Sequence, residues 1–63
     1  MNKLTIYPDG QVIDDAGAVV FRSSVSQQHA REIVHDTIEQ NGCSIGEEWE
    51  MDDDTIEVTI NRN

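Results

Sequence analysis

The chain has 63 residues and a formal net charge of −9, with thirteen acidic side chains against four lysines and arginines. A chain this short buries only about 60% of the surface that its unfolded form exposes, so we expect one small domain over residues 1–63. Its single cysteine, Cys43, excludes an intrachain disulfide, and no apolar run is long enough for a signal peptide or a membrane span. We therefore expect a cytoplasmic protein whose thiol stays reduced.

The negative charge is concentrated in the last third of the chain. Residues 44–60 hold seven carboxylates and no lysine or arginine. Such a field repels nucleic acid and anionic membranes and attracts basic surfaces. The four basic residues are scattered, without the clustering that a phosphate backbone requires. The sequence therefore predicts a basic protein as the partner, with neither direct nucleic-acid binding nor a membrane role.

The N-terminal third indicates three short strands joined by two tight turns. Leu4–Tyr7 alternates and is rich in β-branched and aromatic residues, which is typical of a strand. Pro8–Gly10 predicts a turn, because proline presets φ and glycine accepts positive φ, and the chain returns through Gln11–Ile13. Asp15–Gly17 predicts a second turn, which leads into a third strand at Ala18–Phe21.

One helix is predicted to follow. Ser24, with Gln27 three residues later, fits a capping box at its start. Apolar and small residues then recur at three- and four-residue spacing, which predicts one face packed on the sheet. These residues are Ala30, Ile33, Val34, Thr37 and Ile38. Gly42 is expected to end the helix in the left-handed conformation, with Cys43 packed behind it as a small buried hydrophobe.

The C-terminal third predicts a hairpin. Trp49 and Met51 occupy odd positions, whereas the apolar residues at 56, 58 and 60 occupy even ones, and this change of parity indicates a turn between the two runs. A four-residue loop at 52–55 would place Met51 opposite Ile56 and Trp49 opposite Val58 on the buried side. These two strands would complete the antiparallel sheet.

The same register would gather carboxylates on the solvent side. Glu48 and Glu50 would point outward, with Glu50 directly opposite Glu57, and such like-charge pairs destabilise a strand pair by roughly 0.2–1 kcal/mol. The helix repeats this pattern on its outer face. Its acidic residues there are Glu32, Asp36 and Glu39. Unfavourable charge placement without visible compensation indicates a functional surface, and the alternative is a hairpin that charge merely keeps soluble.

Together these elements predict an α+β fold, a small antiparallel β-sheet with one α-helix packed on one face in the order β-β-β-α-β-β. Other site types fit poorly. Asp52–Asp54 lacks the glycine and spacing of a calcium loop, and His29 and His35 lie on different faces of the predicted helix. Because so small a chain leaves little room for a pocket that would shift a carboxyl pKa, we expect no enzyme activity, metal or cofactor.

In size, acidity and lack of catalytic motifs, the chain resembles the small phage inhibitors that mimic DNA. These include anti-restriction proteins, glycosylase inhibitors and anti-CRISPR proteins, and the resemblance is one of composition over the whole chain. It implies a stoichiometric inhibitor in the host cytoplasm, with carboxylates that take the place of phosphates. The implied partner is a basic DNA-binding protein or nucleoprotein complex, such as a CRISPR effector.

The candidate binding residues come from the two acidic segments and the single tryptophan. They are Glu47, Glu48, Trp49, Glu50, Asp52, Asp53, Asp54 and Glu57, with Glu32, Asp36 and Glu39 as a second patch. Trp49 has two interpretations, a core residue of the hairpin or an aromatic anchor within an acidic face. The alternative function is an acidic structural or regulatory module that binds a basic protein or self-associates through sheet edges, so both a monomer and a homodimer are open.

Overall fold

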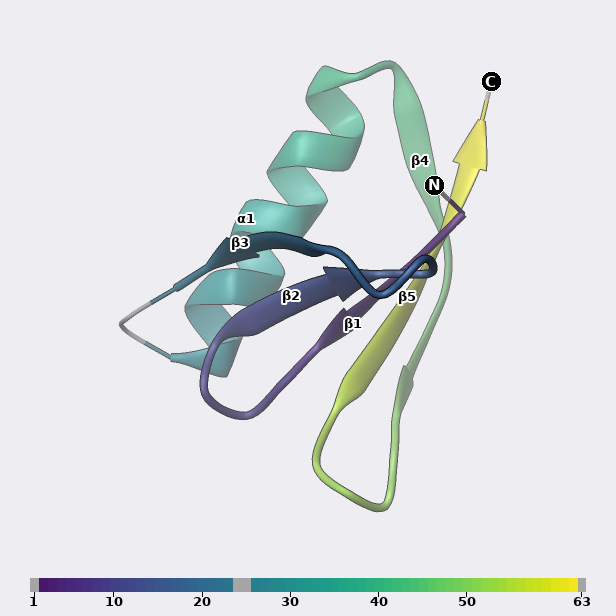
Figure 1. Ribbon diagram of the computed structural model, residues 1–63. Coiled ribbons are helices and arrows are strands. Elements are labelled where there is room, and N and C mark those ends of the chain that lie inside the picture. The colour runs from purple at the N-terminus through teal and green to yellow at the C-terminus, as the bar shows by residue number, and fades with distance from the viewer. Residues whose placement is uncertain (1, 24–25, 63) are drawn as a thin grey trace.

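The computed structural model describes residues 2–23 and 26–62 and shows an α+β fold, as the sequence predicts. In this part of the chain, five antiparallel strands form one sheet, and one helix covers one of its faces (Figure 1). The strands are β1 (Lys3–Ile6), β2 (Gln11–Asp14), β3 (Val19–Arg22), β4 (Cys43–Glu50) and β5 (Ile56–Arg62), and the helix is α1 (Gln27–Gln40). The strand order β3-β2-β1-β5-β4 makes β3 and β4 the edges.

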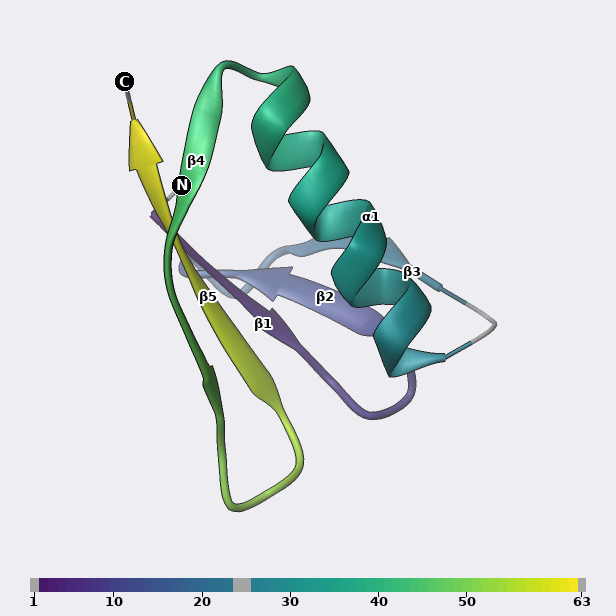
Figure 2. The same cartoon turned by 180° about the vertical axis from the view of Figure 1, so that it is seen from behind.

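The two faces of the sheet differ in what covers them. The helix lies behind the sheet in Figure 1 and in front of it in Figure 2, so the face toward the viewer in Figure 1 is open. The core lies between α1 and the covered face. It comprises Leu4, Ile6, Val12, Ala30, Val34, Ile38, Ile56 and Val58. Cys43, predicted to be a small buried hydrophobe, packs against this core but is only half-buried.

The helix begins later than predicted. Its N-cap is Ser26, whose hydroxyl accepts a hydrogen bond from the His29 N–H at 3.1 Å. Ser24, the predicted cap, lies outside the described residues. Of the predicted stripe, Ala30, Val34 and Ile38 are buried, Ile33 is half-buried and Thr37 is exposed. Gly42 follows the helix with a φ of 76°, as the left-handed residue that the sequence predicts there.

The three hairpin loops of the described residues share one backbone geometry. In each, the N–H of one residue donates a hydrogen bond to the carbonyl of the residue four positions later, across a three-residue loop. The pairs are Tyr7 with Gln11, Asp14 with Ala18, and Met51 with Thr55. The last loop residue is left-handed in each case, Gly10 at φ 89°, Gly17 at 85° and Asp54 at 67°. This is a type I turn closed by a left-handed residue, a common hairpin connection that suits glycine best and aspartate or asparagine next.

The C-terminal hairpin therefore has another register than the predicted one. Its loop is one residue shorter, so Glu50 lies opposite Ile56 and Trp49 opposite Glu57. The predicted pairs, Met51 with Ile56 and Trp49 with Val58, are wrong, and so is the predicted opposition of Glu50 and Glu57. As a result, Trp49 and Met51 lie outside the core and are exposed.

A β-bulge in β4 accounts for the change of face. The flanking pairs are Ile45 with Ile60 and Glu48 with Val58. Gly46 and Glu47 together oppose Thr59, whose Oγ1 accepts from the Glu47 N–H at 2.6 Å and donates to the Glu47 carbonyl at 3.3 Å. A Cβ on Gly46 would lie 2.6 Å from Thr59 Oγ1, so the bulge needs glycine at this position. Beyond it, Glu48 faces the helix and Trp49 faces away.

Candidate protein-binding surface

Glu48 is not the free surface acid that the sequence predicts. It lies on the helix side of β4, with 18% of its side chain exposed. Arg31 of α1 donates from Nε and Nη2 to the two carboxylate oxygens at 3.1 and 2.6 Å, and His35 Nε2 lies 2.8 Å from Oε2. A bidentate guanidinium pair of this kind is among the stronger side-chain interactions. Glu48 therefore joins the edge strand to the helix, and its charge is neutralised within the protein.

The protonation behaviour of Glu48 follows from these contacts. Partial burial by itself would raise the pKa of the carboxyl, but the hydrogen bonds from Arg31 and His35 outweigh burial, so the pKa of Glu48 lies below its ordinary value. The hydrogen bond to Glu48 in turn raises the pKa of the Arg31 guanidinium. The pair is thus fully ionised at neutral pH.

Replacing Glu48 by glutamine is expected to destabilise the protein by about 1–2 kcal/mol at pH 7, because the bidentate pair to Arg31 is lost. Since the folded pKa is depressed, this contribution is present above the unfolded pKa of about 4.3 and is lost as the pH falls through the folded value. Urea unfolding of both proteins at neutral and at acid pH measures the difference, which is expected to shrink in acid. An equal difference at both pH values would contradict the assignment, and the exposed Glu47→Gln serves as the matched control.

Four exposed carboxylates gather at the end of the β4–β5 hairpin. We call this group the acidic hairpin tip, and it comprises Glu50, Asp52, Asp53 and Asp54. Within residues 2–23 and 26–62, none of the four forms an ion pair. The hairpin extends beyond the rest of the sheet in both ribbon views (Figures 1 and 2). The tip is therefore an accessible region of high negative charge.

Hydrogen bonds hold the tip in one conformation. Asp53 Oδ1 accepts from the Thr55 hydroxyl at 2.7 Å and from the Thr55 N–H at 3.2 Å, and these bonds lower the pKa of Asp53. Gln27, in the first turn of α1, donates from Nε2 to the Asp54 carbonyl at 2.7 Å and to the Ile6 carbonyl at 3.1 Å. The loop is thus tied both to the helix and to β1, so its charges are presented on an ordered backbone.

The tip presents its charge on both sides of the hairpin. On the open side, Asp52, Asp53 and Glu57 line a shallow hollow of about 480 Å³. On the helix side, Glu50 and Asp54 line another of about 340 Å³. A partner that wraps around the hairpin end would meet carboxylates from either direction.

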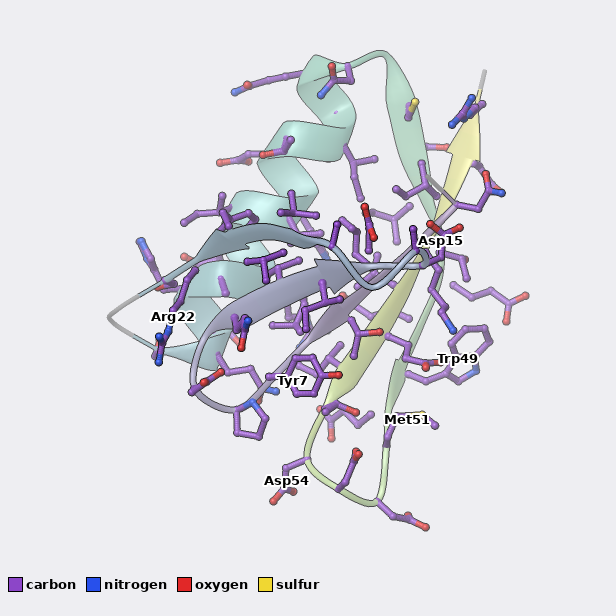
Figure 3. All side chains as sticks on the ribbon, in the orientation of Figure 1. Tyr7, Asp15, Arg22, Trp49, Met51 and Asp54 are labelled. Atoms are coloured by element: carbon purple, nitrogen blue, oxygen red, sulfur yellow. The ribbon has the colours of Figure 1, made fainter. Side chains whose placement is uncertain are left out.

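An exposed apolar cluster lies beside the tip on the open face. We call it the open-face patch, and it comprises Tyr7, Trp49 and Met51, which are 36%, 44% and 43% exposed. In Figure 3, Tyr7 and Met51 lie on either side of the lower part of β5, and Trp49 lies beside β4. Of the two interpretations of Trp49, the core residue is wrong, since the ring is exposed. The sequence predicts neither Tyr7 nor Met51 as a binding residue. For Trp49 and Met51 the available signal was Gly46, because a glycine inside a strand indicates a bulge.

Of the other predicted residues, Glu47 is exposed in the bulge of β4, Glu57 lies in β5 and three acids lie on α1. Glu57, on the open face, is 3.5 Å from Lys3 Nζ, a distance at which exposed ion pairs contribute little. Glu32, Asp36 and Glu39 are exposed on α1, as predicted, and form no ion pair among the described residues. Because Arg31 and His35 occupy the side of α1 that faces β4, this stripe and the hairpin tip are separate acidic patches rather than one surface.

The left-handed backbone of Asp54 allows a test of whether aspartate at this position makes the fold less stable than glycine would. Asp54 is left-handed, whereas the two equivalent loop positions hold glycine. Replacing Asp54 by glycine is expected to stabilise the fold by roughly 0.5 kcal/mol, because glycine adopts this conformation without steric strain. Thermal and urea unfolding measure the change, and Asp54→Ala, which keeps the strain, is the matched control. A glycine variant less stable than the wild type would contradict this account of the loop.

In the described segments, no group of three or more His, Cys, Asp or Glu side chains is arranged to hold a metal ion, and no helix there is long and apolar enough to cross a membrane. Comparison with protein-family models, curated proteins and solved structures finds no match for this chain. The function is therefore inferred from the geometry and charge of the surface.

Proposed function

We propose that this protein is a stoichiometric inhibitor that mimics DNA and acts in the cytoplasm of a host cell. Its target would be the DNA-binding groove of a host defence complex, of the kind that anti-CRISPR or anti-restriction proteins block. The observation that carries the proposal is the acidic hairpin tip, whose four carboxylates are exposed and form no ion pair within the described residues. A net charge of −9 on 63 residues adds a long-range field of the same sign.

The mechanism would be competition for cationic side chains. Lysine and arginine side chains that hold phosphates would pair with the carboxylates of the tip, and such binding weakens as salt is added. The hydrogen bonds from Gln27 and Thr55 support this role, because an ordered loop loses little conformational freedom on binding. The stripe of Glu32, Asp36 and Glu39 would serve as a second patch.

The contact set differs in one respect from the set that the sequence predicts. Glu48 is bound by Arg31 and His35, so it has no charge left to offer a partner. Glu57 is half-buried beside the tip, and Glu47 is exposed in the bulge of the same hairpin. The proposed contact is therefore centred on the end of the hairpin.

Affinity capture from host lysate tests the proposal. The immobilised protein is expected to retain a DNA-binding protein or nucleoprotein complex at about 50 mM NaCl and to release it at about 500 mM, because ionic contacts to a phosphate site weaken steeply with salt. A bait with the tip acids neutralised to Gln and Asn is the control for general acidity. Retained proteins that do not bind DNA, or equal retention by the control bait, would reject the proposal.

A second candidate is an interaction module that self-associates through a sheet edge. The edge strand β3 (Val19–Arg22) carries no acid, and Val19 is 57% exposed. Its one charged side chain, Arg22, lies at the end of the strand, so the exposed edge of β3 can pair with another strand. Sedimentation distinguishes the candidates, since edge pairing requires a dimer that Val20→Pro abolishes. Val20 is the bulged residue of β3, so it is not paired with any residue of β2.

A further inference from the structure

We infer that the open-face patch binds a segment of the target in which an arginine is flanked by apolar residues, a contact that DNA itself does not make. The inference rests on the proposed function, because it assigns a second contact to the same inhibitor. The open-face patch would add an apolar contribution to binding, which should persist in high salt. The patch is Tyr7, Trp49 and Met51, as defined above.

A β-bulge in β4 exposes Trp49. The bulge at Gly46 and Glu47 turns the strand, so that Glu48 faces the helix and Trp49 faces away. Without a bulge, the alternation that places Ile45 on the covered face would also place Trp49 there. An exposed tryptophan on so small and charged a domain has no role in the core, and tryptophan is a frequent anchor of protein interfaces.

The residues of the open-face patch lie next to one another on the sheet. Trp49 lies opposite Glu57 in β5, and Glu57 lies opposite Thr5 in β1. Tyr7 and Met51 line the same shallow hollow as Glu57. The exposed rings and the thioether therefore surround one carboxylate on a single face, rather than lying at unrelated points of the surface.

The rim of the hollow is acidic. Asp52, Asp53 and Glu57 line it, and the described residues that line it include no lysine or arginine, although Lys3 lies 3.5 Å from Glu57. A guanidinium group fits such a site, because its plane stacks on an aromatic ring while its N–H groups bond carboxylates. Apolar residues next to that arginine would cover Trp49 and Met51. The charge also disfavours a second copy of this chain, since a two-fold contact would bring the carboxylates of both copies together.

The single tryptophan provides the readout, because Trp49 emission reports directly on the patch. The probe is a synthetic peptide of arginine, leucine and glycine, compared with a peptide in which serine replaces leucine. At about 500 mM NaCl, the leucine peptide is expected to shift the Trp49 emission to the blue with saturation and to bind about 10-fold more tightly than the serine peptide. Equal affinities, or no spectral shift, would overturn the inference.

Matched variants locate the contact. Tyr7→Ser and Met51→Ser are each expected to weaken the leucine peptide about 10-fold, whereas Val19→Ser, an exposed apolar residue of edge strand β3, is expected to leave it unchanged. Unfolding curves verify that the variants fold. An equal loss in Val19→Ser would show nonspecific apolar binding and overturn the inference. So would wild-type emission that depends on protein concentration, because the patch would then bind a second copy.

Binding to the target captured from host lysate distinguishes this inference from the proposed function. Trp49→Ala is expected to weaken its binding about 30-fold with an unchanged slope of affinity against salt, whereas loss of the tip acids lowers that slope. A target that does not bind DNA would refute the mimicry and leave the peptide results standing. A DNA-binding target for which Trp49→Ala binds as tightly as the wild type would refute only the role of the patch.

Discussion

Reversing Glu47, Glu50 and Asp52 to lysine is expected to weaken target binding by about 100-fold or more and to leave the fold intact. All three are exposed, and none forms an ion pair in the described segments. Asp53 and Asp54 are left unchanged, because Asp53 bonds to Thr55 and Asp54 is left-handed. Titration calorimetry with the captured target measures the loss, and circular dichroism verifies the fold.

The control for this experiment is a reversal of the helix stripe. Changing Glu32, Asp36 and Glu39 to lysine raises the net charge by the same amount, since each reversal adds two charges, from −9 to −3 in both variants. The stripe is separated from the tip by Arg31 and His35, so we expect a clearly smaller loss of affinity. Equal losses in the two variants would show that total charge, rather than the position of the acids on the β4–β5 hairpin, determines binding.

Replacing Gly46 by valine is expected to destabilise the protein by about 2–3 kcal/mol. The new Cβ would lie 2.6 Å from Thr59 Oγ1, and moving that hydroxyl away breaks its two hydrogen bonds with Glu47. If β4 instead straightens to avoid the clash, a one-residue slip would turn Trp49 toward the helix and Glu48 toward solvent. Urea unfolding gives the stability, and Trp49 emission reports the orientation of the strand.

Ser44→Val is the matched control, because Ser44 is exposed in the same strand and pairs with Asn61 ahead of the bulge. It is expected to change stability by less than about 0.5 kcal/mol and to leave the emission of Trp49 unaltered. A Gly46→Val protein as stable as the wild type, with unchanged emission, would show that the bulge does not depend on glycine.

Local signals in the sequence predicted the order of the elements and most of the turns. The Pro8–Gly10 and Asp15–Gly17 turns depend on residues that accept positive φ, and both lie where predicted. The helix stripe was recognised from spacing alone, and its buried members lie against the sheet. These features depend on neighbours within a few positions, which a single sequence displays.

The faces of the last hairpin could not be predicted in the same way. The predicted pairing requires an unbroken strand and a four-residue loop, whereas the structure has a bulge at Gly46 and a three-residue loop closed by Asp54. Each changes the register by one residue, and one residue exchanges the two faces of a strand. The ion pair of Glu48 could not be predicted for another reason. Arg31 is distant from Glu48 in sequence and contacts it only when the helix packs beside β4.

Displacement by duplex DNA decides whether this protein occupies a DNA-binding groove. The captured target is saturated with this protein, labelled at a terminus, and titrated with unlabelled duplex DNA while fluorescence anisotropy follows release. If exposed carboxylates occupy the phosphate-binding groove, DNA releases the protein in a competitive manner, and the lysine-reversed hairpin fails to compete with DNA in return. A complex that duplex DNA leaves intact at saturating concentration would contradict the account.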